Sequence, residues 1–176
     1  PKIRVWYTLT EIGLMHSRRA INPFQLHLAP GGYTTKKVQE NGGNVVEVGY
    51  PKFAQFFQEG SIDNKITRKT ERSTILYAPT HNKDNRSSIP DFFRQVVELT
   101  DDFEIILKPH VATKQKENYF LDMFSDFGVN IVDGFRMTRE LLQDVDLIIG
   151  DLQSGVPFEG IITNIPTIAL RPTSPS

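Results

Sequence analysis

The sequence predicts an α/β protein, with a Rossmann-like parallel sheet covered by helices on both faces. Two observations from residue 71 onward predict this fold. Short apolar runs alternate with segments whose apolar residues have helical spacing. The runs are apolar at every position instead of every second one, which is typical of parallel strands buried on both faces. We therefore expect the strands to be parallel and the helices to connect them.

The expected elements follow one another regularly along the chain. Strands are expected over 74–78, 103–107, 129–132, 147–149 and 167–170. Helices are expected over 88–99, 114–126, 138–142 and 156–163. Ser88 is an N-cap residue type followed by Pro90 and Asp91 in the first turn, and Gly128 stands where a C-terminal cap belongs.

The pattern is weaker before residue 71. Residues 45–48 resemble a strand, and the phenylalanines at 53, 56 and 57 suggest a short helix after it. Residues 59–72 are polar and mixed in charge, as in a linker. We expect residues 1–58 to be the tail of an N-terminal domain, 59–72 a linker, and 73–176 a Rossmann-like domain that is incomplete at its end. Both ends of the sequence resemble cuts in a longer chain.

Composition excludes several classes of protein. The 176 residues include no cysteine, which excludes disulfides, thiolate nucleophiles and Cys-ligated zinc, and which fits a cytoplasmic protein. No apolar run approaches the ~20 residues of a membrane-spanning helix. Residues 1–88 carry a net charge of +6 and residues 89–176 a net charge of −7. The basic half suits a phosphate-bearing ligand or a lipid surface, or it is ordinary solvated surface. The sequence has no Lys/Arg cluster interleaved with aromatic residues, which argues against nucleic-acid binding.

Polar residues follow the first two predicted strands of the Rossmann-like domain. Thr80 and His81 come after the first strand, and Lys108 and His110 come after the second. Right-handed crossovers place all strand-to-helix loops at one edge of the sheet, where ligands bind in such folds. A histidine there can donate to a phosphate oxygen or act as an acid or base, or it can simply be a surface residue at a strand end.

The loop after the fourth strand carries small and polar residues. Asp151, Ser154 and Gly155 precede the next helix, and Glu159 lies one turn inside it on the same side as Gly155. Small residues at a helix start can seat a phosphate, and Glu159 is either an acceptor for ligand hydroxyls or an ordinary surface residue. The loop matches neither the dinucleotide-binding GxGxxG pattern nor the P-loop, and no Asp/His cluster has metal-ligand spacing.

Several short motifs in order resemble the CDP-glycerol glycerophosphotransferase family, the teichoic-acid and capsule polymerases with a GT-B fold. The matching segments are Gly49-Tyr50-Pro51-Lys52, Leu76-Tyr77-Ala78-Pro79-Thr80, Leu107-Lys108-Pro109-His110, Glu140-Leu141-Leu142 with Asp144 and then Asp146-Leu147-Ile148-Ile149-Gly150-Asp151 and Ser154, and Asn164-Ile165-Pro166-Thr167-Ile168. Together they extend over about residues 45–170. Lys52 replaces an arginine of the family pattern, a further arginine after Thr80 is missing, and the family's double serine is Ser154-Gly155 here.

The resemblance implies a GT-B enzyme that moves glycerol phosphate from CDP-glycerol to a hydroxyl of a teichoic-acid or capsule-type polymer, without a metal or other cofactor. His110 is the implied catalytic residue of the donor domain. His16 is the nearest match to a histidine that activates the acceptor hydroxyl in the N-terminal domain. The implied substrate-binding residues are Thr80, His81, Lys108, Asp151, Ser154, Gly155, Glu159 and Lys52. A polymer or lipid-linked acceptor and a peripheral position on the inner face of the cell membrane are also implied.

Other functions remain open on the sequence alone. The departures from the family pattern also fit an enzyme with another nucleotide-activated donor. A GT-B nucleotide-sugar glycosyltransferase or a UDP-sugar epimerase would share the fold and the phosphate seat. A non-catalytic GT-B-like binding module is a third reading, because the missing arginine and the reduced serine pair could reflect a degenerate site.

Overall fold

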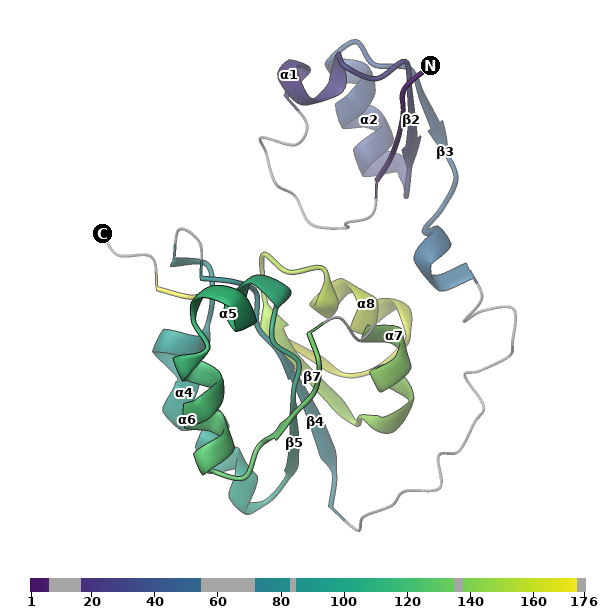
Figure 1. The fold of residues 1–176 in the computed structure, drawn as a ribbon. Coiled ribbons are helices and arrows are strands. Elements are labelled where there is room, and N and C mark those ends of the chain that lie inside the picture. Colours follow the sequence, from purple (N-terminus) through teal and green to yellow (C-terminus); the bar gives the residue numbers. More distant parts are fainter. Residues whose placement is uncertain (7–16, 55–71, 83–84, 135–137, 174–176) are drawn as a thin grey trace. The chain divides into compact units, whose positions relative to one another are not determined.

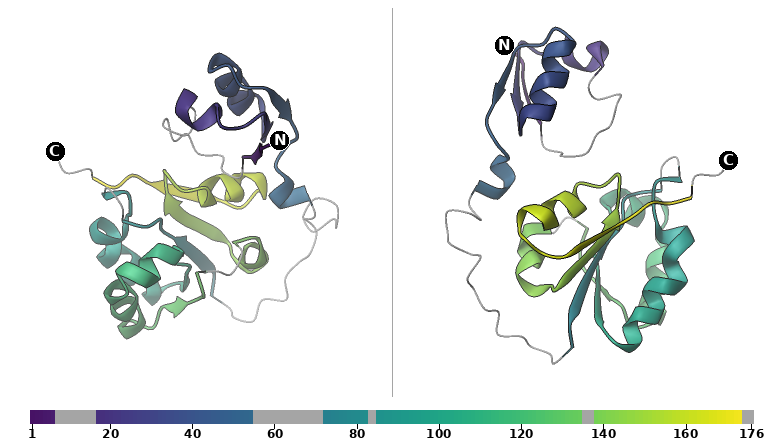
Figure 2. Two further views of the ribbon diagram at one scale, coloured as in Figure 1. Left: turned by 45° about the horizontal axis from the view of Figure 1, so that its top comes forward. Right: turned by 180° about the vertical axis from the view of Figure 1, so that it is seen from behind.

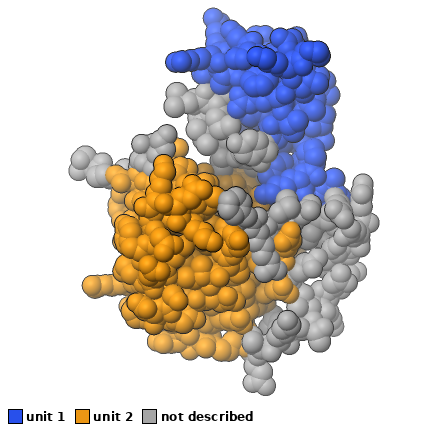
Figure 3. Space-filling view, viewed as in Figure 1, with its two compact units in different colours: residues 1–63 blue, residues 64–176 orange. Residues whose placement is uncertain are grey.

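The computed structural model describes residues 1–6, 17–54, 72–82, 85–134 and 138–173. It divides the chain into two compact units, residues 1–63 and 64–176 (Figure 3). His16 and most of the expected linker lie outside the described residues. In the described ranges, no helix is both long and apolar enough to cross a membrane.

Unit 2 is built on a parallel sheet of the kind the sequence predicts. Its strands are β4 (Thr74–Ala78), β5 (Glu104–Leu107), β6 (Asn130–Ile131), β7 (Leu147–Asp151) and β8 (Thr167–Leu170). They lie in the order β6-β5-β4-β7-β8, and every neighbouring pair is parallel. The chain winds outward from β4 in one direction and from β7 in the other. The switch point of this doubly wound sheet therefore lies between the carboxyl ends of β4 and β7.

Helices cover both faces of this sheet (Figures 1 and 2). One face carries α4 (Ile89–Glu98) and α6 (Tyr119–Asp126), and the other carries α7 (Thr138–Leu141) and α8 (Val156–Ile162). The short helix α5 (Val111–Lys116) follows β5, and the 3-10 turns η5 (Leu99–Asp101) and η6 (Leu142–Asp144) complete the unit.

The apolar strands are buried because both faces are covered. Alternate strand residues pack with α4 and α6 in one core: Ile75, Tyr77, Ile105, Leu107 and Ile149 with Val96, Phe120, Leu121 and Phe124. The intervening Leu76 and Ile148 are fully buried on the opposite side of the strands. This two-sided burial explains why the sequence shows continuous apolar runs and no alternation.

Two details of the helices differ from the expectation. The single helix expected over 114–126 is two helices, because Glu117 leaves helical geometry at φ −138° and ψ 39°. Ser88 does stand at the N-cap position of α4, but its side chain caps no helix N–H. Its hydroxyl instead contacts the Tyr77 hydroxyl at 2.7 Å, a partner that lies on β4.

Unit 1 contains a smaller parallel sheet, of which the sequence predicted only the third strand. Its elements are β1 (Ile3–Val5), α1 (Arg18–Ile21), β2 (Leu26–Ala29), α2 (Gly32–Glu40), β3 (Val45–Glu47) and the 3-10 turn η2 (Pro51–Phe53). The strands lie in the order β1-β2-β3. Trp6, Ile21 and Val38 form the core of this unit.

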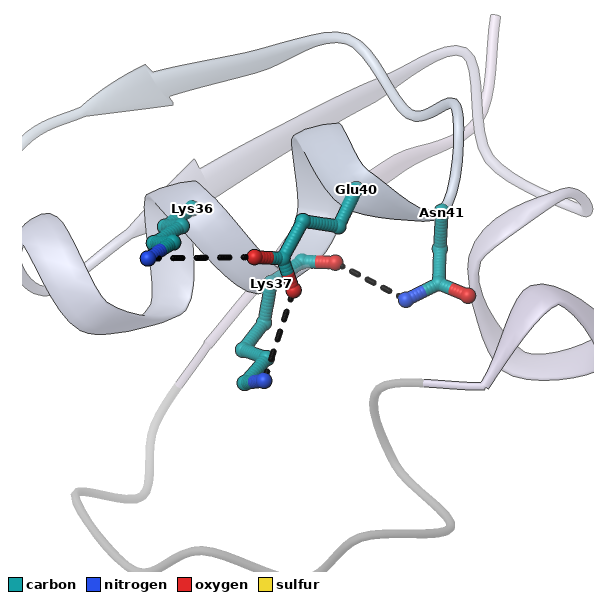
Figure 4. A network of polar contacts seen from close by, with 4 residues as sticks. All are labelled: Lys36, Lys37, Glu40 and Asn41. Carbon is teal, nitrogen blue, oxygen red and sulfur yellow. Dashed lines mark hydrogen bonds and ion pairs between the residues drawn. The ribbon is translucent and has the colours of Figure 1, made fainter.

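Polar side chains contact one another at the last turn of α2 (Figure 4). Glu40 pairs with Lys37 at 3.3 Å and with Lys36 at 4.0 Å, and the Asn41 side-chain amide donates to the Lys37 carbonyl at 3.0 Å. Such exposed pairs add little stability individually, so the buried residues hold α2 in place.

Candidate functional site

The candidate site lies at the carboxyl ends of β4, β5 and β7 in unit 2 (Figure 1). The parallel register brings three loops to this edge of the sheet, as the sequence predicts. Thr80 and His81 follow β4, Lys108 and His110 follow β5, and Asp151 is the last residue of β7. Ser154 and Gly155 join β7 to α8.

Asp151 is a fully buried polar residue of this region. Its side chain is 0 % exposed, and each carboxylate oxygen accepts a backbone N–H. Thr80 donates to Oδ2 at 2.6 Å and Ser88 donates to Oδ1 at 3.1 Å. Burial raises the pKa of Asp151 to about 6, although hydrogen bonds from Ser88 and Thr80 oppose this shift. Asp151 therefore joins the end of β7 to both sides of the β4–α4 connection.

Tyr77 extends this buried network. Its hydroxyl lies 2.7 Å from the Ser88 hydroxyl, and its ring is fully buried against Phe124. Burial raises the pKa of Tyr77, so the phenol stays neutral at physiological pH. In the sequence, Tyr77 is part of a predicted strand and of a family motif, and Ser88 is an N-cap residue type. Their contact joins residues on different elements, which no local pattern reveals.

Two histidines meet at the ends of β4 and β5. The ring centroids of His81 and His110 lie 4.6 Å apart with an angle of 38° between the rings. Nδ1 of His110 accepts the Ala112 N–H at 3.1 Å, which leaves the proton of the neutral ring on Nε2. Burial lowers the pKa of His110, and the neighbouring His81 and Lys108 lower it further. His110 is therefore a neutral donor in the absence of an anion.

Lys108 and Gly134 fix the turn that carries His110. The Lys108 ammonium donates to the Gly134 carbonyl at 3.2 Å. Gly134 is buried, and a Cβ atom there would lie 2.9 Å from the Pro109 carbonyl oxygen. The glycine thus permits a close approach of two backbone segments at the site. No pattern in the sequence marks Gly134 as part of the site.

The β7–α8 loop holds the predicted phosphate seat in a defined conformation. The Ser154 N–H donates to the Asp151 carbonyl at 2.8 Å, and the Ser154 hydroxyl accepts the Val156 N–H at 3.3 Å. Glu159 is 2 % exposed, so it is not an ordinary surface residue. A Cβ on Gly155 would lie 4.0 Å from Glu159 Oε1, which agrees with the expectation that both residues lie on one side of the helix.

The remaining predicted residues lie in unit 1. Lys52 lies in η2, and its ammonium is 5.9 Å from the ring centroid of Phe53. His16 falls outside the described residues. Within the described parts of the chain, no group of three or more His, Cys, Asp or Glu residues is arranged to hold a metal ion.

The chain is similar to known proteins in its sequence and in its fold. The family model "CDP-Glycerol:Poly(glycerophosphate) glycerophosphotransferase" matches residues 33–173. No curated protein gave a match. Among solved structures, the chain is similar to the wall teichoic acid polymerase TagF, with 20% identity and a TM-score of 0.57. That match covers 95% of this chain and 48% of the TagF chain, so the sequence spans about half of its structural relative.

Proposed function

Because the chain belongs to the CDP-glycerol:poly(glycerophosphate) glycerophosphotransferase family, we propose that it is the donor-binding part of a polymerase. The reaction transfers glycerol phosphate from CDP-glycerol to a hydroxyl of a teichoic-acid or capsule-type polymer. The observation that carries the proposal is the meeting of His81, His110 and Lys108 at the ligand-binding edge of the sheet. Cationic and N–H donor groups at this edge match a diphosphate.

The proposed transfer of glycerol phosphate depends on charge stabilisation more than on covalent catalysis. The acceptor oxygen forms a bond to the phosphorus that carries glycerol, and the bridging P–O bond to CMP breaks. The acceptor hydroxyl loses its proton, and negative charge develops on the departing CMP. Positioning and stabilisation of this charge dominate phosphoryl transfer.

Each residue of the candidate site has a proposed role in this step. His110 donates from Nε2 to the leaving phosphate, Lys108 adds positive charge beside it, and His81 offers a further ring N–H donor. Thr80 contributes a hydroxyl, and Ser154 and Gly155 seat the diphosphate at the start of α8. Glu159 accepts from hydroxyl groups of the donor.

The acceptor side is proposed from the family resemblance alone. His16 takes the proton of the acceptor hydroxyl, and Lys52 contributes a charge from unit 1. The acceptor is a polymer or a lipid-linked molecule, which would bring the enzyme to the inner face of the cell membrane as a peripheral protein.

Replacing His110 in the full-length protein tests the proposal. We expect His110→Ala to lower transfer of labelled glycerol phosphate by about 100-fold or more, the usual loss when one preorganised donor is removed. Lys114→Ala is the matched control, because Lys114 is exposed on α5 one turn after His110. Its activity should equal that of the unchanged protein.

The alternatives give other outcomes. Unchanged polymer output in His110→Ala would support a non-catalytic binding module. Preference for uridine over cytidine ligands would support a nucleotide-sugar glycosyltransferase or epimerase and would remove the substrate assignment while keeping the fold.

A further inference from the structure

We propose that Asp151 is a positioning residue that fixes the β4–α4 connection beside the donor site and does not itself touch the donor. This inference rests on the proposed function for the identity of the donor. It replaces the expectation that Asp151 binds substrate directly.

Both oxygens of the Asp151 carboxylate are already bonded to the backbone. Asp151 is 0 % exposed, and its two oxygens accept N–H groups from two different places. Thr80 lies just after β4, and Ser88 lies just before α4. One side chain of β7 therefore holds both ends of the connection that crosses the switch point.

A carboxylate suits this role better than any neutral side chain. Each of its oxygens can accept, so both N–H groups are satisfied at once. An asparagine would offer one accepting oxygen and would turn its NH₂ group toward the other N–H donor. Burial makes ionisation of Asp151 costly, as its raised pKa indicates. The buried carboxylate therefore needs its two N–H donors in order to stay ionised.

The contact reaches the donor site through Thr80. The Thr80 N–H is held by Asp151, and the Thr80 hydroxyl lies 3.5 Å from Nδ1 of His81. The His81 ring in turn packs on His110. Displacement of Thr80 would therefore move His81 relative to His110, and a diphosphate would meet a looser set of donors.

Asp146 provides a matched control at the opposite end of the same strands. Its Oδ2 accepts the Thr74 N–H at 2.9 Å, at the amino end of β4. Asp151→Asn and Asp146→Asn thus remove the same chemical group from the same pair of strands. Only the first change lies at the ligand-binding edge.

Two readouts on this chain test the proposal: amide hydrogen exchange and calorimetric titration with CDP-glycerol. In Asp151→Asn, we expect the Thr80 and Ser88 amides to exchange at least about tenfold faster. We expect CDP-glycerol to bind about tenfold more weakly or worse. Asp146→Asn should leave both quantities unchanged. Unaltered exchange of Thr80 and Ser88 in Asp151→Asn, or unaltered CDP-glycerol affinity despite faster exchange, would overturn the positioning role.

A pH series on the unchanged protein gives a second test that needs no variant to fold. Protonation of Asp151 removes one hydrogen-bond acceptor. The protection of the Thr80 or Ser88 amide against hydrogen exchange should therefore fall below about pH 6, once the rates are corrected for intrinsic exchange. The groups nearby are the Tyr77 phenol, the Ser88 hydroxyl and the imidazoles of His81 and His110. His81→Asn and His110→Asn should keep the loss of protection, which separates the effect of Asp151 from that of the two imidazoles. Constant protection from pH 7.5 to 5 contradicts the proposal.

Failure of CDP-glycerol to bind even the unchanged protein overturns the proposed function, while the exchange data still decide the role of Asp151.

Discussion

Gly134→Ala is expected to disturb the turn that carries His110. The added Cβ would lie 2.9 Å from the Pro109 carbonyl oxygen and 3.4 Å from the Val111 nitrogen. Both atoms belong to the backbone, so no flexible side chain can move aside. Relief therefore requires a shift of the β5–α5 turn or of the segment after β6, and either shift alters the contact of Lys108 with the Gly134 carbonyl.

The cost follows from the size of this overlap. Forcing an extra carbon into a packed site costs about 1–3 kcal/mol. For a unit of this size, a loss of about 2 kcal/mol lowers the melting temperature by about 8 °C. Because His110 lies between Pro109 and Val111, CDP-glycerol affinity should fall together with stability.

Thermal unfolding followed by circular dichroism, together with calorimetric titration of CDP-glycerol, measures both effects. Gly32→Ala is the control, since its Cβ would meet only the Glu47 carboxylate at an ordinary 3.9 Å. A Gly134→Ala protein that melts within about 1 °C of the unchanged protein and binds CDP-glycerol equally well would refute the reasoning.

Three further predictions concern other parts of the fold. Gly160→Ala should destabilise unit 2 by about 1–2 kcal/mol in denaturant unfolding, because the clash of the added Cβ with Thr167 outweighs the gain in helix propensity. A more stable variant would contradict this packing. Tyr77→Phe should cost about 1 kcal/mol in the same assay, since Ser88 loses a buried partner, and no change would show that this bond adds nothing. Unit 1 should lose stability as the pH falls through about 6.5, because burial lowers the pKa of His27 and only the unfolded chain readily takes up the proton. Unfolding followed by the fluorescence of Trp6, the single tryptophan, would reveal this loss, and a stability of unit 1 that does not change with pH would contradict it.

The fold of unit 2 could be predicted because burial leaves a direct trace in its sequence. Strands covered on both faces are apolar at nearly every position, as Ile75–Ala78 in β4, Ile105–Leu107 in β5 and Leu147–Ile149 in β7 show. Once the strands are parallel, their carboxyl ends must share an edge. The meeting of Thr80 and His81 with Lys108 and His110 follows from that rule.

Apart from β3, unit 1 offered no comparable signal. Its strand β1 has only three residues, and Ile3 and Val5 are 51 % exposed. The β2 strand carries His27, which is buried through bonds to Trp6 and to the Ile21 carbonyl. A polar residue in a short strand resembles a loop in the sequence, because its partners are distant.

The buried contacts of Asp151 could not be predicted for the same reason. Its partners lie 71 and 63 residues earlier in the chain, so its position after a strand suggested a ligand contact. Gly134 was missed because a close backbone approach depends on the path of another segment. Sequence patterns locate the edge of the sheet, whereas long-range contacts decide which residues there face a ligand.

The most direct test of the account is calorimetric titration of this chain with CDP-glycerol, CMP, UMP and UDP-GlcNAc, repeated on Ser154→Ala. The account predicts that both cytidine ligands bind, that the uridine ligands bind much more weakly, and that Ser154→Ala weakens CDP-glycerol binding. Tighter binding of uridine ligands, or CDP-glycerol binding that Ser154→Ala leaves intact, would contradict the donor site placed at the carboxyl ends of β4, β5 and β7.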